Sequence, residues 1–279
     1  MSANHLGARL RRITLFCALL TLGPRIALAQ GGPPYLANDT GTPGNKDWEI
    51  NFGYMPFLYS GQSVMHTPDV DINFGVGDRI QLTYESAWLR VHNPSQPVKY
   101  GLGQDVLGVK WRFYDTGERG MAFSVFPMLS VNNPNHSVQR EITPPGASLL
   151  LPVEFTKKFG PIDVNLEGGY QFVHLGPDGW LTGLVVGHDF TKKLEIDSEF
   201  YATGTWRPGY AQPTIDVGAR YRIHRPFILL LMAGRSVQHI SASNGQPSWI
   251  AYVGFQLLLG PKERVTRQVE QKLPDESKQ

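Results

Sequence analysis

Residues 107–113 read Leu-Gly-Val-Lys-Trp-Arg-Phe, and their apolar and small or charged side chains alternate one by one. Successive side chains of a β-strand point to opposite faces of the sheet, so one face here is apolar and the other carries two cations. This pattern is typical of a barrel that touches lipid outside and water inside. The same alternation recurs in segments of about ten residues from residue 46 onward.

The repeated alternation predicts an all-β chain with about twelve antiparallel strands. Their expected ranges are 47–58, 68–76, 80–91, 104–114, 121–131, 146–157, 162–173, 180–190, 194–204, 213–223, 227–237 and 248–259.

The connections between these strands alternate in length. Short ones are expected at 77–79, 115–120, 158–161, 191–193 and 224–226. Longer ones, rich in Pro, Gly and Asn, are expected at 59–67, 92–103, 132–145, 174–179, 205–212 and 238–247. Outer-membrane barrels have short periplasmic turns and longer extracellular loops. The sequence therefore predicts a transmembrane up-and-down barrel over residues 47–260, with both termini in the periplasm.

The N-terminus has the layout of a secretory signal peptide. The basic range Arg9–Arg12 precedes an apolar stretch at 13–22, and the small residues Ala27 and Ala29 stand before Gln30. The apolar stretch is shorter than the ~20 residues that a membrane helix needs. We therefore predict that residues 1–29 are removed on export to the bacterial outer membrane, and that the mature chain begins near Gln30.

The two segments that flank the barrel lack the alternation. Residues 30–46 are predicted to be a periplasmic linker, and residues 261–279 a charged periplasmic tail. Cys17 is the sole cysteine and lies in the signal peptide, so the mature chain has no disulfide, thiolate metal site or cysteine nucleophile. The net charge of +2 comes from scattered residues and gives no basis for nucleic-acid binding.

Charged side chains on the polar strand faces are expected to point into the lumen. The candidates for solute selectivity are Lys110, Arg112, Glu154, Asp163, Glu167, Glu195, Asp197, Glu199, Asp216, Arg220, Arg222 and Arg235. Glu49, Asp69, Asp71 and Glu85 are expected on the same face. Such charges set selectivity in some channels, but they also pair with one another and hold a barrel in shape. We favour pairing of the cations with the acidic segments 163–167 and 195–199.

The segment from Tyr100 to Phe113, Tyr-Gly-Leu-Gly-Gln-Asp-Val-Leu-Gly-Val-Lys-Trp-Arg-Phe, resembles a segment of the family named for the MetA pathway of phenol degradation. Supporting pieces are Val-Gly-Asp-Arg-Ile-Gln-Leu at 76–82, Lys-Phe-Gly-Pro at 158–161 and Gly-Arg-Ser at 234–236. The resemblance covers most of the mature chain. It implies an outer-membrane transporter-like barrel that takes up hydrophobic or aromatic compounds, and it transfers no catalytic residues.

The function that we predict is passive passage of small solutes, sorted by the lumen charges and by the loop at 132–145. If this loop folds inward it narrows the pore, and if it folds outward it offers a contact surface. The partners expected for such a barrel are a small-molecule solute, outer-membrane lipids and the barrel-assembly machinery. A structural or ligand-binding barrel without conductance remains the alternative.

A lipid-modifying enzyme is the rival class. Its catalytic candidates are His188 with Thr182 or Ser198, but the sequence has no Gly-x-Ser-x-Gly elbow or other nucleophile motif. The histidines have no ligand-like spacing. We therefore predict no enzymatic activity, no metal and no cofactor.

Overall fold

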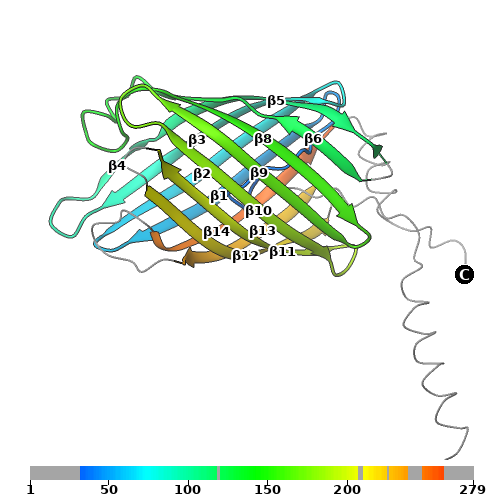
Figure 1. The fold of residues 1–279 in the computed structure, drawn as a ribbon. Coiled ribbons are helices and arrows are strands. Elements are labelled where there is room, and N and C mark those ends of the chain that lie inside the picture. Colours follow the sequence, from blue (N-terminus) through cyan, green and yellow to red (C-terminus); the bar gives the residue numbers. More distant parts are fainter. Residues whose placement is uncertain (1–31, 118–119, 207–209, 225, 238–246, 261–279) are drawn as a thin grey trace, which may run out of the picture.

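The computed structural model of the protein describes residues 32–117, 120–206, 210–224, 226–237 and 247–260. The predicted signal peptide (1–29) and charged tail (261–279) lie outside these described residues. The described chain is all β, and its strands wind into one barrel that lies on its side in Figure 1. No helix in the described part of the chain is long and apolar enough to cross a membrane.

The strands in chain order are β1 (Trp48–Tyr59), β2 (Gln62–Val76), β3 (Ile80–His92), β4 (Lys99–Leu102), β5 (Gln104–Asp115), β6 (Met121–Val125), β7 (Met128–Asn132), β8 (Ser148–Phe159), β9 (Ile162–Val173), β10 (Gly179–Asp189), β11 (Leu194–Thr205), β12 (Tyr210–His224), β13 (Phe227–Ser236) and β14 (Pro247–Leu259).

Each strand pairs antiparallel with its neighbours, and β1 pairs with β14 to close the sheet. β4 and β5 both pair with β3, so together they are one crossing strand with an interruption. β6 and β7 likewise share the partners β5 and β8. The prediction of a closed antiparallel barrel with twelve crossing strands is thus confirmed.

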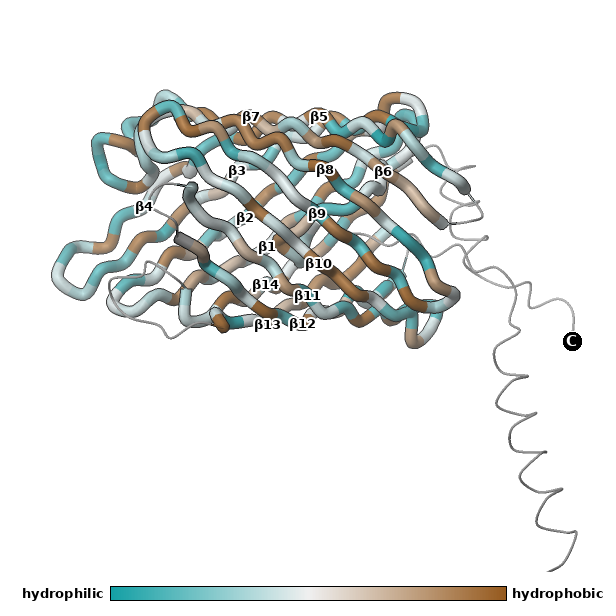
Figure 2. Tube along the Cα trace, viewed as in Figure 1, coloured by the Kyte–Doolittle hydropathy of each residue, from teal (hydrophilic) through white to brown (hydrophobic). Residues whose placement is uncertain are grey.

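The two faces of the barrel wall differ as the alternation predicts. On β12, Ile215 and Val217 are about half exposed on the outside, whereas Asp216 is buried inside. Figure 2 shows this change of hydropathy from residue to residue along the strands. Large aromatic side chains lie on the outer surface near both ends of the barrel, among them Trp111 and Trp249. Aromatic side chains at these levels match the interfacial girdles of membrane barrels.

The predicted long loop at 59–67 is wrong. β1 and β2 continue through this range until Tyr59 pairs with Gln62, and the turn between them ends in Gly61. Gly61 has a φ of 83°, a left-handed conformation that glycine adopts without steric cost. Pro68, with which the predicted strand 68–76 begins, lies within β2 where the register of β2 against β3 shifts, and strands tolerate proline at such bulges.

Two other predicted long loops are shorter than expected. β4 occupies the end of the predicted loop 92–103, and β12 begins inside the predicted loop 205–212. Residues 238–246 lie outside the described part of the chain. The short connections at 77–79, 160–161 and 190–193 match the predicted turns to within a few residues.

The seam between β1 and β14 yields a first prediction. Gly254 pairs with Gly53 there, and a Cβ atom on Gly254 would lie 2.3 Å from the carbonyl oxygen of Phe52. We expect Gly254→Ala to reduce the folded fraction, because the two backbones must separate to admit the methyl group. The measurement is the heat-dependent gel shift of membrane barrels. Gly168→Ala is the matched control, since its Cβ would meet nothing within 4 Å. Equal folded fractions would contradict the expectation.

Candidate functional site

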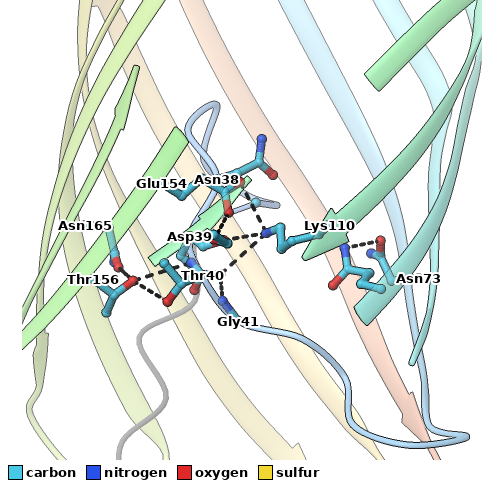
Figure 3. Close-up of polar contacts among 12 residues, drawn as sticks. Asn38, Asp39, Thr40, Gly41, Asn73, Lys110, Glu154, Thr156 and Asn165 are labelled. Carbon is cyan, nitrogen blue, oxygen red and sulfur yellow. Dashed lines mark hydrogen bonds and ion pairs between the residues drawn. The ribbon is translucent and has the colours of Figure 1, made fainter. Parts of the chain in front are cut away.

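Residues 32–47 run inside the barrel, and we call them the luminal finger. The prediction of a periplasmic linker at 30–46 is therefore wrong for its described residues. The lower part of the finger binds the turn between β2 and β3: the Thr42 hydroxyl donates to the carbonyl of Asp78, and the amide of Gly77 donates to the side chain of Asn45. The rest of the finger contacts the inner wall of the barrel. Figure 3 shows it beside Lys110 of β5 and Thr156 of β8, and the amide of Ala37 binds Glu199 of β11.

Two luminal carboxylates hold the tip of the finger through its backbone. The amides of Leu36 and Ala37 donate to the two carboxylate oxygens of Glu199, at 3.0 and 2.6 Å. The backbone amide of Asn38 donates to Glu167 at 2.9 Å. Both glutamates are 3% exposed. Hydrogen bonds to a charged acceptor are about twice as strong as neutral ones, so these contacts fix the tip of the finger.

Lys110 is the cation at the centre of this network (Figure 3). Its ammonium donates to the backbone carbonyl of Asp39 and lies 3.4 Å from Glu154, which is fully buried. The hydroxyl of Thr40 donates to the hydroxyl of Thr156 at 2.8 Å. The finger is thus bound to β5 and β8 on one side and to β9 and β11 on the other.

Arg220 of β12 binds the start of the finger. Its guanidinium donates to the carbonyls of Gly32 and Pro33, at 3.1 Å each. The same group lies 3.9 Å from Glu195 and 3.8 Å from Asp197. Arg220 therefore joins the acidic strand β11 to the finger, and it is 3% exposed.

Tyr35 of the finger covers an apolar part of the inner wall. Its ring is 4% exposed, and the guanidinium of Arg220 lies 5.1 Å from the ring centroid. The buried wall residues of this apolar cluster are Met55, Ile228, Leu230, Met232, Ile250 and Tyr252. The lumen thus has an apolar side on β13 and β14 together with Met55 of β1, and a charged side on β2, β5, β8, β9, β11 and β12.

Carboxyl groups face each other across neighbouring strands on the charged side. Like charges at directly opposite positions destabilise a sheet unless something compensates them. The opposing pairs are Asp71 with Glu85, Glu154 with Glu167, and Glu199 with Asp216. Backbone amides of the finger donate to Glu167 and to Glu199. The ammonium of Lys110 lies beside Glu154. The finger therefore supplies part of the compensation that this wall requires.

The loop between β7 and β8, residues 133–147, folds into the other end of the lumen. Ile142 is 8% exposed and packs on the inner face of β3, against Ala87, Leu89 and Val91. The hydroxyl of Ser137 donates to the carbonyl of Leu102 at 2.6 Å. Of the two orientations left open for the loop at 132–145, the structure has the inward one, which narrows the extracellular mouth.

The structure brings most of the predicted lumen residues to the inner wall. Buried there are Lys110, Glu154, Asp163, Glu167, Asp197, Glu199, Asp216 and Arg220. Glu195, Arg112 and Arg222 share the strand faces of these residues and are partly exposed. The expected pairing of cations with the acidic segments is correct for Arg220, which lies beside Glu195 of β11. Lys110 instead pairs with Glu154 and Asp39. Arg112 pairs with Asp115 at 3.3 Å.

Arg235 is not a lumen residue, so its prediction is wrong. It pairs with the outward residue Ile215, is exposed, and lies 5.4 Å from the ring of Trp249. The physical reason is that β13 presents Leu230 and Met232 to the lumen, so its inward face is apolar. A charge on this strand consequently points outward, near an interfacial aromatic residue.

Of the two hydroxyl residues considered for catalysis, Thr182 lies far from His188. Thr182 and His188 are six positions apart on β10, about 20 Å at ~3.4 Å per residue. The hydroxyl of Thr182 donates to the carbonyl of Glu167, and a ring nitrogen of His188 lies 3.0 Å from the carbonyl of Pro161. No group of three His, Cys, Asp or Glu within the described ranges is placed to hold a metal ion.

No family model matches the sequence, and no curated protein matches it. Among solved structures, the chain is similar to the COG4313 outer membrane channel from Pseudomonas putida F1, with a TM-score of 0.61 and 12% identity over 83% of this chain and 100% of that one. It is also similar to the NanC porin (TM-score 0.54, 7% identity, 75% and 98% covered) and to the KdgM porin in complex with oligogalacturonate (TM-score 0.51, 13% identity, 75% and 98% covered). The fold is therefore that of outer-membrane, porin-like barrels.

Removing the central cation gives the second prediction. Lys110→Met should lower the free energy of unfolding by roughly 3–5 kcal/mol, the usual loss when one partner of a buried ion pair is removed. Urea unfolding in lipid vesicles measures it. Lys157→Met is the matched control, because Lys157 lies outside the lumen over the ring of Phe159 at 5.7 Å. Adding Glu154→Gln to Lys110→Met should recover part of the loss. An equal effect of both lysine variants would refute the central role of Lys110.

The inward loop gives a prediction on pH. Lys99 donates to Glu141 at 2.5 Å, and this hydrogen bond and positive charge lower the pKa of Glu141. The contact therefore stabilises the loop fully above the ordinary glutamate pKa of about 4.3 and is lost as pH falls through the lowered value.

A spin label at position 139 reports this change, because Gln139 is exposed and the sole cysteine of the chain, Cys17, lies in the predicted signal peptide. We expect greater label mobility in acid, and Glu141→Gln should produce the same increase at neutral pH. The effect is small, because the Glu141 side chain is 76% exposed. Arg140→Gln is the control. Mobility that does not respond to Glu141→Gln would show that the ion pair does not hold the loop.

Proposed function

We propose that the protein is an outer-membrane channel that lets small solutes cross passively, and that the luminal finger sets its width. The observation that carries this proposal is the attachment of the finger. Side-chain hydrogen bonds and ion pairs fix its tip inside a closed wall, and the strand pairing that closes this wall does not pass through the tip. Such a segment narrows a lumen without breaking the barrel. The fold shared with outer-membrane channels supports the same function.

We extend the proposal to the class of solute. The apolar side of the lumen, formed by residues such as Leu230 and Ile250, supports hydrophobic or aromatic solutes. The resemblance to the phenol-degradation family agrees with this chemistry. The charged side supports a solute that also carries a polar group. Export through a cleaved signal peptide and contacts with outer-membrane lipids and the assembly machinery belong to the same proposal.

A second candidate function is ligand binding without conductance. Its support is that the luminal finger and the loop 133–147 enter the same lumen from opposite ends. Both candidates share the fold, so conductance separates them.

Single-channel recordings in planar bilayers test the proposal. Deletion of residues 32–45 should raise the conductance, because it removes the narrowing segment from a wall that closes without it. Glu167→Gln together with Glu199→Gln should also raise the conductance, because a neutral glutamine side chain binds the backbone N–H groups of the finger more weakly than a carboxylate does. Asp163→Asn is the control, since Asp163 pairs with Lys158 at 3.6 Å.

The outcomes separate the two candidates. Silence of the wild type and of the deletion variant would overturn the channel and favour ligand binding. Stronger current block by benzoate than by acetate would support an aromatic solute, and equal block would argue against it.

A further inference from the structure

The tip of the luminal finger, residues 35–38, lies on the inner wall in the way that a bound ligand does. Two inward glycines make room for it. A Cβ atom on Gly218 of β12 would lie 2.6 Å from the ring of Tyr35, and one on Gly183 of β10 would lie 2.5 Å from the Cβ of Ala37. The wall is therefore hollowed at the two places where the tip rests.

The hollow over Gly218 is a slot for an aromatic ring. The Tyr35 ring occupies it and packs in the apolar cluster that includes Leu230 and Met232 of β13. Met232 is the partner of Gly218 in the sheet. The guanidinium of Arg220 lies 5.1 Å from the ring centroid, within the range at which a cation attracts the face of a ring. The slot thus offers an aromatic group both apolar contact and a cation.

The hydrogen bonds between the tip and the wall run from N–H groups of the finger to carboxylates. Leu36 and Ala37 donate to Glu199, and Asn38 donates to Glu167 from its backbone at 2.9 Å and from its side chain at 3.3 Å. Neither glutamate forms an ion pair with a residue that the structure describes. Because a buried carboxylate without a donor is costly, a molecule that replaces the tip must bring N–H groups of its own.

A third carboxyl group at this place has the same requirement. Asp216 of β12 stands directly opposite Glu199 and is 4% exposed. Neither of its carboxyl oxygens accepts a hydrogen bond from a donor in the described part of the chain. Buried polar groups are normally hydrogen-bonded, so the site has acceptors for more donors than the finger supplies.

We propose that the hollow under the tip is a binding site for an aromatic solute with an N–H donor, in the simplest case an aromatic amine, and that the tip occupies this site in the absence of the solute. The inference rests on the proposed function in that the solute enters the lumen. The Cβ, Cα and carbonyl carbon of Tyr35 separate its ring from the amide nitrogen of Leu36. The compound 3-phenylpropylamine has the same spacing, so its ring fills the slot while its ammonium group faces Glu199.

An aromatic carboxylate is the rival ligand, because Arg220 is a cation at the slot. The guanidinium of Arg220 already lies 3.9 Å from Glu195 and 3.8 Å from Asp197, and it donates to two carbonyls that precede the tip. A carboxylate in place of the tip would also meet Glu199, and like charges at close range oppose binding. The surroundings of the slot therefore favour an N–H donor over a carboxylate.

Calorimetric titration of the full chain in nonionic detergent tests the proposal and does not require conductance. The probes are 3-phenylpropylamine, 3-phenylpropanoate, which has the same ring and a carboxylate, and butylamine, which has no ring. Tyr35→Ala empties the slot, so this variant should bind 3-phenylpropylamine at least about tenfold more tightly than the wild type does. The other two probes should bind the variant at least about tenfold more weakly than 3-phenylpropylamine.

Gly183→Ala displaces the tip in a second way. Its methyl group would meet Ala37 of the finger at 2.5 Å, whereas the nearest wall atom, in Tyr201, lies at 3.5 Å. The ring slot over Gly218 stays open, so this variant should also bind 3-phenylpropylamine more tightly than the wild type. Gly168→Ala is the matched control, because its methyl group meets nothing within 4 Å.

A carboxylate variant tests the N–H acceptor. Adding Glu199→Gln to Tyr35→Ala should weaken the binding of 3-phenylpropylamine about tenfold, because the hydrogen bond to a charged acceptor is lost. Asp163→Asn in the same background should leave the affinity unchanged, since Asp163 is a luminal carboxylate that pairs with Lys158.

Four results would overturn the proposal: no binding of 3-phenylpropylamine to either tip variant, equal affinity of the wild type and both variants for it, equal affinity of Tyr35→Ala for the amine and the carboxylate, and equal effects of Glu199→Gln and Asp163→Asn. Failure of the channel proposal has a different outcome. A silent barrel that binds the amine as expected loses the channel and keeps the site, whereas a conducting barrel without this binding keeps the channel and loses the site.

Discussion

Hydrocarbon offers no hydrogen-bond partner to a peptide group, so each N–H and C=O of a membrane-crossing strand must find its partner within the protein. The pairing of β1 with β14 meets this constraint by leaving the sheet without an edge. The close approach of Gly53 and Gly254 lets the two strands pair along nearly their whole length. Because the wall is closed, every second side chain must point into the lumen. The contents of that lumen then decide both stability and function.

The inner wall and the luminal finger stabilise each other. The register of the strands sets Glu154 opposite Glu167 and Glu199 opposite Asp216, which is unfavourable for charged groups without compensation. The finger supplies backbone amides and a carbonyl, and Lys110 supplies a positive charge. A hydrogen bond to a charged group contributes about 1.5–3 kcal/mol, so these contacts offset part of the conformational entropy that the finger loses when it becomes ordered.

The sequence predicts the strands well because the alternation of apolar and polar residues is visible within each strand, without knowing which strand it pairs with. It does not reveal which residues stand opposite each other, because the opposition of Asp71 and Glu85 depends on the register between two strands. The finger escapes prediction because it has no repeating pattern. In retrospect, an apolar pair, Tyr35 and Leu36, in a Gly- and Pro-rich segment was the available signal.

The errors have physical causes that are specific to their sites. Arg235 was assigned to the lumen on the rule that charges face inward, and that rule fails on β13 because its inner face packs against Tyr35. The strand that was predicted to begin at Pro68 begins at Gln62, and Pro68 occupies a bulge within a long hairpin. The orientation of the loop 133–147 depends on contacts of Ile142 with β3, which lie far away in the sequence.

The asymmetry of the lumen gives the finger more than a space-filling role. Tyr35 covers the apolar side on β13 and β14, while the amides that follow it bind carboxylates on β9 and β11. Movement of the finger therefore uncovers two unlike surfaces at once, one apolar and one acidic. The apolar surface is unfavourable in contact with water, whereas the acidic surface attracts cations and water. Under the proposed function, a solute with an aromatic body and a polar group would contact both surfaces, so the contacts that keep the lumen narrow would also determine which molecules can replace them.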